Sequence, residues 1–322
     1  LLKGRRSIAL EIALENQLVH FYAATDPDLE AYFLSQLTAQ YPKALVAKVK
    51  DFLPNWLQGQ TLRAGNMAFG QLVLASPYYY PLKTYKDFKE VDPLSSLLGM
   101  LAKATPADKA LIQYVLVPAP NSYYTSAQGL IDKGIQTRDE LGRVHTKPLP
   151  QARLISQKIL HKAFWTGLRL LTVSVSKPVA ESFLSHLSGS FGTFTFGEGN
   201  SLVLKKPTFF KQRLLQAIFS RRFAGVPNYQ FLNIEELATL WHLPGTTLSK
   251  IKNIAWGGTL ISEAPENLPV AVGLTPEQKK EINFFAKTEF RNTMTTFGIK
   301  RPDRRKHIYI IGKTGTGKST LI

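Results

Sequence analysis

The sequence predicts an α+β fold made of two ferredoxin-like βαββαβ units in tandem, followed by the beginning of an α/β P-loop domain. Strand and helix patterns occur in the order β-α-β-β-α-β over residues 1–120 and again over 151–245. The first helices of the two units share a local pattern, since Pro27 and Pro178 are each followed three residues later by a glutamate. The third observation is a glycine-rich phosphate-binding motif in the last residues of the sequence.

The first unit, residues 1–120, begins with alternating apolar and polar residues over 7–25, a pattern typical of a β-hairpin. Asp26 is a suitable N-cap for a helix that starts at Pro27, and apolar residues at helical spacing give this helix one buried face. The remaining predicted elements are strands at 44–52 and 66–75, a helix at 92–105 and a strand at 109–120.

The second unit, residues 151–245, starts with a helix over 151–165. The elements predicted after it are a strand at 167–176, a helix at 177–189, strands at 190–196 and 200–206, a helix at 207–220 and a strand at 228–233. Asn233 then caps a short helix that stops at Pro244 and Gly245.

Three segments connect or follow these units. Residues 121–150 show no sustained periodicity and end in Pro-Leu-Pro, so they are expected to form a flexible linker. Residues 246–275 are rich in proline and form a connector. Residues 276–322 are the incomplete start of the P-loop ATPase domain, with strands expected at 282–290 and 295–299.

The composition limits the classes of protein that fit. A chain of 322 residues, 44% hydrophobic, is long enough for two or three globular units. Because the chain has no cysteine, disulfides, thiolate metal sites and a cysteine nucleophile are excluded. Its apolar runs are far shorter than the roughly 20 residues of a membrane helix. The sequence begins with Leu1 and ends inside a motif, so we expect it to be a piece of a longer polypeptide.

Basic residues are concentrated in two blocks of the chain, which has a net charge of +17. Residues 141–222 contain 13 basic and 2 acidic residues, and residues 291–322 contain 8 and 1. This asymmetry predicts a polyanionic partner, either nucleic acid or an anionic membrane surface. The alternative is a solvated basic surface without a ligand, and the sequence leaves both open. The DNA contacts that we expect lie in residues 141–222 and 291–306.

The motif at the end of the chain matches the P-loop pattern G-x-x-x-x-G-K-[ST] without a mismatch. The short apolar run "HIYIIG" before it is typical of a buried strand, and "KSTLI" is suited to a helix start. The residues predicted to bind the nucleotide are Gly312, Lys313, Thr314, Gly315, Thr316, Gly317, Lys318, Ser319 and Thr320.

Each residue type in this motif has a chemical reason. The glycines let backbone N–H groups surround the β-phosphate at a helix N-terminus. Lys318 is predicted to reach the β- and γ-phosphates of ATP, and the Ser319 hydroxyl to bind Mg²⁺, so these two are the predicted catalytic residues. Only about five residues follow Gly317, fewer than a stable helix needs. We therefore expect a poorly ordered phosphate site and no ATPase activity from residues 1–322.

The stretch "FGIKRPDRRKHIYIIGKTGTGKSTLI" resembles the entry to the motor domain of the coupling ATPases of type IV secretion and conjugation systems, which are ring-forming DNA translocases. The stretches "PLKTYKDFKEVDPLSSLLGML", "IQYVLVPAP" and "NIEELATLWHLPG" resemble the region before that motor in large bacterial members. The resemblance implies an ATP-driven pump of DNA or protein, hexameric when complete, at the cytoplasmic face of the bacterial inner membrane together with the secretion machinery. The acidic second nucleotide motif and the arginine finger of such motors are absent from this sequence.

Other candidate residues have competing interpretations. The run Lys300, Arg301, Arg304, Arg305 and Lys306 could contact DNA or a neighbouring subunit's nucleotide, or form a solvated loop. The aromatic clusters "PYYYP" and "NSYYT" could stack on single-stranded bases, although packing inside the fold is the more common role. The six histidines show no metal-ligand spacing, so no metal beyond Mg²⁺ is predicted.

Two functions besides a motor fit the sequence. One is a nucleotide-dependent scaffold or switch that moves no polymer, and the other is an interaction module that binds its partners without the P-loop. A motor requires an acidic strand end and a trans-acting arginine further along the chain, which separates it from a scaffold. An interaction module requires that the first 270 residues bind partners unaided.

Overall fold

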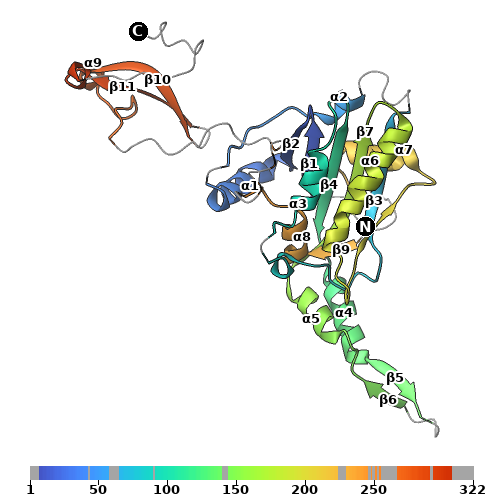
Figure 1. Cartoon of the computed structure of the whole chain (residues 1–322). Coiled ribbons are helices and arrows are strands. Elements are labelled where there is room, and N and C mark those ends of the chain that lie inside the picture. The colour runs from blue at the N-terminus through green and yellow to red at the C-terminus, as the bar shows by residue number, and fades with distance from the viewer. Residues whose placement is uncertain are drawn as a thin grey trace. The chain divides into compact units, whose positions relative to one another are not determined.

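The computed structural model describes residues 7–42, 44–57, 65–89, 91–139, 144–223, 230–245, 248, 251, 254, 267–290 and 293–306 (Figure 1). The chain divides into two compact units. The first consists of Leu1–Glu30 with Asp51–Ala255, and the second of Ala31–Lys50 with Trp256–Ile322. The described residues form a mixed α+β fold with antiparallel sheets.

The first unit is built on one seven-stranded sheet in the order β2-β1-β4-β7-β3-β8, with β9 paired to β7. Neighbouring strands are antiparallel throughout. The strands are β1 (Ile8–Glu15), β2 (Leu18–Ala24), β3 (Met67–Leu74), β4 (Lys109–Pro118), β7 (Ala163–Val173), β8 (Leu202–Lys205) and β9 (Gln230–Asn233). On one side of β7, β9 pairs with residues 163–166 and β3 with residues 168–173.

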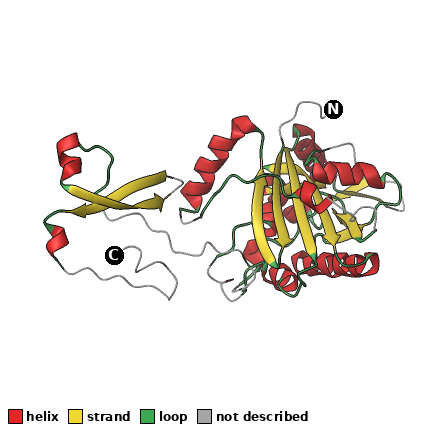
Figure 2. Ribbon diagram, turned by 90° about the horizontal axis from the view of Figure 1, so that it is seen from above, coloured by secondary structure: helices red, strands yellow, loops and turns green. Residues whose placement is uncertain are grey.

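Helices cover both faces of this sheet (Figure 2). One apolar core lies under α3 (Ser95–Leu101), α6 (Lys177–Gly189) and α8 (Ile234–Leu240). The other lies under α2 (Leu53–Leu57) and α7 (Lys211–Phe219). Side chains of β1, β3, β4 and β7 are divided between the two cores, because successive residues of a strand point to opposite faces. The helix predicted at 177–189 is confirmed with the same bounds, and those predicted at 92–105, 207–220 and 233–245 are confirmed with shorter bounds.

The strands of the two predicted ferredoxin-like units do not form separate sheets, because β3, from the range 1–120, lies between β7 and β8 of the range 151–245. Most residues of β3 are buried on both faces, as suits a strand inside a sheet. Gly70 permits the close approach of β8, since a Cβ at this position would lie 2.9 Å from the carbonyl oxygen of Lys205.

Two of the predicted strands, at 44–52 and 190–196, are not found in the part of the chain that the structure describes. Residues 44–52 form no helix or strand, and η2 (Ser190–Phe194), a 3-10 helix, replaces the strand predicted at 190–196. Phe191 and Phe194 of η2 are both buried in the core under α6. A 3-10 helix places residues three apart on one side, so η2 buries Phe191 and Phe194 together, whereas a strand would point them to opposite faces.

The segment 121–150, predicted to be a flexible linker, contains α4 (Asn121–Lys133) and the hairpin of β5 (Ile135–Arg138) and β6 (Val144–Lys147). Helix α5 (Ala152–Leu160) packs against α4, and the hairpin extends beyond this helix pair (Figure 1). All eight residues of the two strands are exposed. Strands solvated on both faces carry no apolar alternation, which explains why the sequence pattern missed them.

In the second unit, β10 (Ile282–Phe290) and β11 (Thr293–Lys300) form an antiparallel hairpin. The two strands were predicted for this range, but their pairing was not. Helix α9 (Pro276–Lys280) precedes it, and the 3-10 helix η4 (Asp303–Arg305) follows. Helix α1 (Pro27–Gln40) spans the division between the units. Its bounds agree with the prediction, but none of its residues is buried, so the predicted buried face is not found.

The described helices include no segment with the length and apolar character needed to cross a bilayer. The 3-10 helix η1 (Tyr85–Asp87) completes the described elements of the first unit.

Candidate functional site

The predicted nucleotide-binding residues, 312–320, lie outside the described residues. Lys318 and Ser319, the predicted catalytic pair, are among them, as is the predicted Mg²⁺ ligand. Within the described residues, no group of three or more histidine, aspartate or glutamate side chains could hold a metal ion.

The basic run that precedes the motif is on the surface of the second unit. Lys300, Arg301, Arg304, Arg305 and Lys306 are all exposed. The Lys306 ammonium group donates to Asp303 at 2.8 Å, which lowers the pKa of the aspartate and raises that of the lysine. Such an exposed pair adds little stability, so the run keeps a strongly positive surface.

A buried polar row crosses the sheet of the first unit on the face covered by α7. Glu11 of β1, Gln113 of β4 and Arg169 of β7 are direct neighbours in the strand register. They are exposed by only 0%, 0% and 2%. Gln113 donates to Glu11 Oε1 at 2.7 Å, and Arg169 Nη1 donates to Gln113 Oε1 at 3.1 Å. Burial of such groups is tolerated because they are hydrogen-bonded to one another.

The buried polar row also holds the carboxyl end of α7. Arg169 donates to the carbonyl oxygens of Ala217 at 2.7 Å and Arg222 at 2.8 Å, and Gln113 donates to that of Ile218 at 2.9 Å. The last carbonyl groups of a helix lack partners within the helix and carry partial negative charge. A buried guanidinium group at this end therefore fixes both the position and the direction of α7.

Arg221, just after α7, links the row to the segment before α2. It donates to Glu11 at 3.0 Å and to Asp51 at 2.8 Å. Burial raises the pKa of Glu11 despite the neighbouring arginine, and Glu11 Oε2 has no hydrogen-bond partner among the described residues. Burial opposes ionisation of Asp51 as well, but the hydrogen bonds from Arg221 and from the Leu53 amide group outweigh it and lower its pKa.

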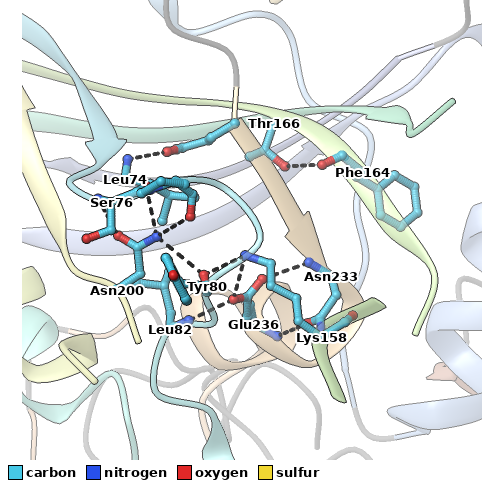
Figure 3. A network of polar contacts seen from close by, with 12 residues as sticks. Leu74, Ser76, Tyr80, Leu82, Lys158, Phe164, Thr166, Asn200, Asn233 and Glu236 are labelled. Atoms are coloured by element: carbon cyan, nitrogen blue, oxygen red, sulfur yellow. Dashed lines mark hydrogen bonds and ion pairs between the residues drawn. The ribbon is translucent and has the colours of Figure 1, made fainter. Parts of the chain in front are cut away.

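A second buried cluster centres on the ion pair of Lys158 and Glu236, whose side chains are 3.0 Å apart and fully buried (Figure 3). Glu236 also accepts the amide hydrogens of Leu82 and Asn233, and Lys158 donates to the carbonyl oxygen of Tyr80. Burial lowers the pKa of Lys158, although the carboxylate opposes this shift. The cluster joins α5, α8 and the segment after β3, which are distant in the sequence.

Two amides extend this cluster along the segment that follows β3. The side chain of Asn200 accepts from the Ser76 amide group and donates to the carbonyl oxygens of Ser76, Pro77 and Tyr80. Gln230 of β9 accepts from the Leu74 amide group and donates to the Leu72 carbonyl. Because these side chains bond mainly backbone groups, the arrangement indicates a structural clasp for the segment 74–82.

The aromatic residues of this segment are packed against other rings. Tyr78 lies 5.6 Å from Tyr123 and 5.2 Å from Phe231 between ring centroids, and Tyr123 lies 4.7 Å from Phe231. Tyr123 is only 2% exposed, and burial raises its pKa strongly. The clusters "PYYYP" and "NSYYT" therefore meet inside the first unit, as the packing interpretation predicts.

Residues 4–256 match the protein family described as "Domain of unknown function (DUF8128)". The chain belongs to this family. The matched range, which we call the DUF8128 domain, ends next to Ala255, the last residue of the first compact unit. Searches of the curated proteins and of the solved structures find no significant match.

The structure separates the basic residues of the DUF8128 domain into two groups. Lys158, Arg169 and Arg221 are at least partly buried and bonded within the fold. The exposed basic residues of the block 141–222 are Lys147, Arg153, Lys162, Lys177, Lys205, Lys206, Lys211, Arg213 and Arg222. A signal for the buried group exists in the sequence, because Arg169 stands alone in the apolar strand "GLRLLTV". The number of basic residues in a block does not show which of them are buried.

Proposed function

We propose that this chain is the amino-terminal region and the start of the motor domain of an ATPase of the type IV secretion and conjugation class. The observation that carries the proposal is the complete P-loop pattern from Gly312 to Ser319, directly after an apolar run. ATP and Mg²⁺ are the ligands, with Lys318 on the phosphates and Ser319 on the metal ion. The α/β P-loop domain that starts within 276–322 belongs to this proposal.

The DUF8128 domain serves assembly or substrate docking in this proposal. Its buried clusters join segments that are distant in the sequence, which suits a rigid platform. The complete protein forms a ring, a hexamer, and works at the cytoplasmic face of the inner membrane with the secretion machinery. DNA contacts come from exposed basic residues of 141–222 and 291–306, so DNA affinity falls steeply with salt.

An ATPase assay tests the proposal, using the polypeptide that the gene encodes when it is read past Ile322. We expect Lys318→Ala to abolish ATP hydrolysis, because Lys318 is the lysine predicted to reach the β- and γ-phosphates. Lys287→Ala is the matched control, since it removes an exposed lysine of β10, outside the motif. Equal loss in both variants, or a stop codon directly after Ile322, would overturn the proposal.

A second candidate, an interaction module that works without nucleotide, is favoured by one observation. The family match covers residues 4–256 and stops before the P-loop, so the family is defined without the nucleotide-binding motif. If so, residues 1–270 retain all partner binding, and Lys318→Ala changes none of it. A nucleotide-dependent scaffold differs, because its partner binding requires ATP but no hydrolysis.

A further inference from the structure

The segment between β8 and α7 combines exposed aromatic and basic side chains. We call residues 205–213, with the sequence "KKPTFFKQR", the Phe-basic loop. It follows β8, which is the last strand of the sheet order and hence an edge strand. The sequence predicts a strand end and a helix for this segment and places its charges in the basic block 141–222, but it gives the two phenylalanines no role. Neither the P-loop nor the buried clusters account for them.

The two phenylalanines of this loop are unusually exposed. Phe209 is 79% exposed and Phe210 is 73% exposed, whereas the other phenylalanines with described side chains include fully buried examples such as Phe191 and Phe194. No ring contact to either side chain is found among the described residues. Adjacent, protruding apolar rings on a surface mark a site of interaction.

Basic residues surround the two rings without acidic neighbours along the chain. Lys205, Lys206, Lys211 and Arg213 are all exposed. The sequence contains no aspartate or glutamate between Glu198 and Glu235. The partner of the loop is therefore both anionic and able to take up apolar side chains.

The backbone holds this loop in a defined conformation. Phe210 has φ 56° and ψ 31°, the left-handed region that bulky residues rarely occupy. Directly after it, α7 is fixed on the sheet by the buried residues Leu214, Ala217 and Ile218. Phe210 is thus an exposed, bulky residue in a rarely occupied backbone conformation, directly before a helix that is fixed on the sheet. Such a residue favours a functional role for this position.

We propose that the Phe-basic loop binds an anionic phospholipid surface, with Phe209 and Phe210 entering the boundary between headgroups and acyl chains. Protruding apolar rings with lysine and arginine beside them are what such a surface takes up. Single-stranded nucleic acid fits less well. Proteins that bind it place aromatic side chains along a positively charged groove, where each ring stacks on one base. The proposal goes beyond the motor function and does not require ATP hydrolysis. It assigns the basic residues of the loop to the lipid surface and leaves the other exposed basic residues of 141–222 as the proposed DNA contacts.

Vesicle sedimentation with the chain of residues 1–322 tests this proposal. We expect binding to vesicles of phosphatidylglycerol and phosphatidylcholine, and much weaker binding to phosphatidylcholine alone. The double variant Phe209→Ser/Phe210→Gly should bind the anionic vesicles at least about tenfold more weakly. Glycine adopts the left-handed conformation without strain, so this variant should keep the melting temperature of the natural protein.

Matched control variants show whether vesicle binding depends on this loop or on exposed apolar and basic residues in general. Leu160→Ser is the apolar control, because Leu160 is also 79% exposed but lies on α5, and it should leave vesicle binding unchanged. Replacing Lys206, Lys211 and Arg213 by serine should weaken binding by about tenfold or more and reduce its salt dependence. The charge control is the same replacement at three exposed residues elsewhere, Arg138, Lys147 and Arg153.

Three results would overturn the proposal. The first is equal binding to anionic and neutral vesicles, or none to either. The second is an unchanged affinity in the folded Phe209→Ser/Phe210→Gly variant, or an equal loss in Leu160→Ser. The third is loss of single-stranded oligonucleotide binding in the double variant while vesicle binding persists, which would assign the loop to nucleic acid. None of these results depends on ATPase activity, so the motor proposal is tested separately.

Discussion

The two ends of α7 show opposite uses of basic residues from one block of sequence. At the carboxyl end, Arg169 is 2% exposed and donates to the carbonyl oxygens of Ala217, in the helix, and of Arg222, just after it. At the amino end, Lys211 and Arg213 are exposed beside Phe210, which is 73% exposed. Some basic residues of 141–222 therefore stabilise the fold from within, and others form a positively charged surface. A charge count along the sequence cannot distinguish the two.

The largest expected effect comes from breaking the buried end. Arg169→Met should lower the free energy of unfolding by about 3–5 kcal/mol, because Gln113 and the carbonyl groups of Ala217 and Arg222 lose their donor in a buried site. Urea denaturation measures the change. Arg213→Met on the exposed surface of the same helix is the control, with an expected change within about 0.5 kcal/mol. A loss below about 1 kcal/mol for Arg169→Met would contradict the structural role.

The second prediction concerns Lys158, the buried cation of the other cluster. Lys158→Met should cost about 3 kcal/mol in unfolding free energy, because it leaves the buried carboxylate of Glu236 without a cation. The loss should be smaller than for Arg169, because Glu236 keeps the amide groups of Leu82 and Asn233 as donors.

A double-variant cycle sharpens this prediction. Glu236→Gln added to Lys158→Met removes the unpaired charge, so the double variant should be more stable than the sum of the two single losses predicts. Additive losses, measured by the same urea denaturation, would show that the two side chains are not coupled. Lys162→Met, which removes an exposed lysine close in sequence, is the control for the loss of charge alone.

The fold was predictable from the sequence where the signal is local. The hairpin of β1 and β2 and the helices α3, α6, α7 and α8 have clear periodicity or capping signals, and Asn233 forms the expected capping box with Glu236. Strand pairing is not a local property, so nothing in "NMAFGQLVLA" indicated that β3 pairs with β7 and β8. The exposed hairpin of β5 and β6 was missed because neither of its faces is apolar.

The same difference between local and non-local signals applies to the candidate sites. The P-loop is readable in the sequence because eight residues define its chemistry without tertiary information, yet residues 312–320 lie outside the described part of the chain. The buried polar row was missed, because Glu11, Gln113 and Arg169 meet only through the sheet register. The Phe-basic loop was missed because exposure, and not composition, sets it apart from the packed rings of "PYYYP".

The smallest expected effect lies at the border between buried and exposed groups, where Asp51 binds Arg221. The Asp51 side chain is 42% exposed, so solvent screens the pair, and Asp51→Asn should cost no more than about 1 kcal/mol at neutral pH. Since folding lowers the pKa of Asp51, its ionised form stabilises the folded state. This contribution is complete above the ordinary pKa of 3.8 and is lost as the pH falls through the lowered value in the folded protein.

Urea denaturation as a function of pH should therefore give curves for the natural protein and Asp51→Asn that differ at neutral pH and converge in acid. A constant difference down to the lowest pH would show that the aspartate acts through packing and not through its charge.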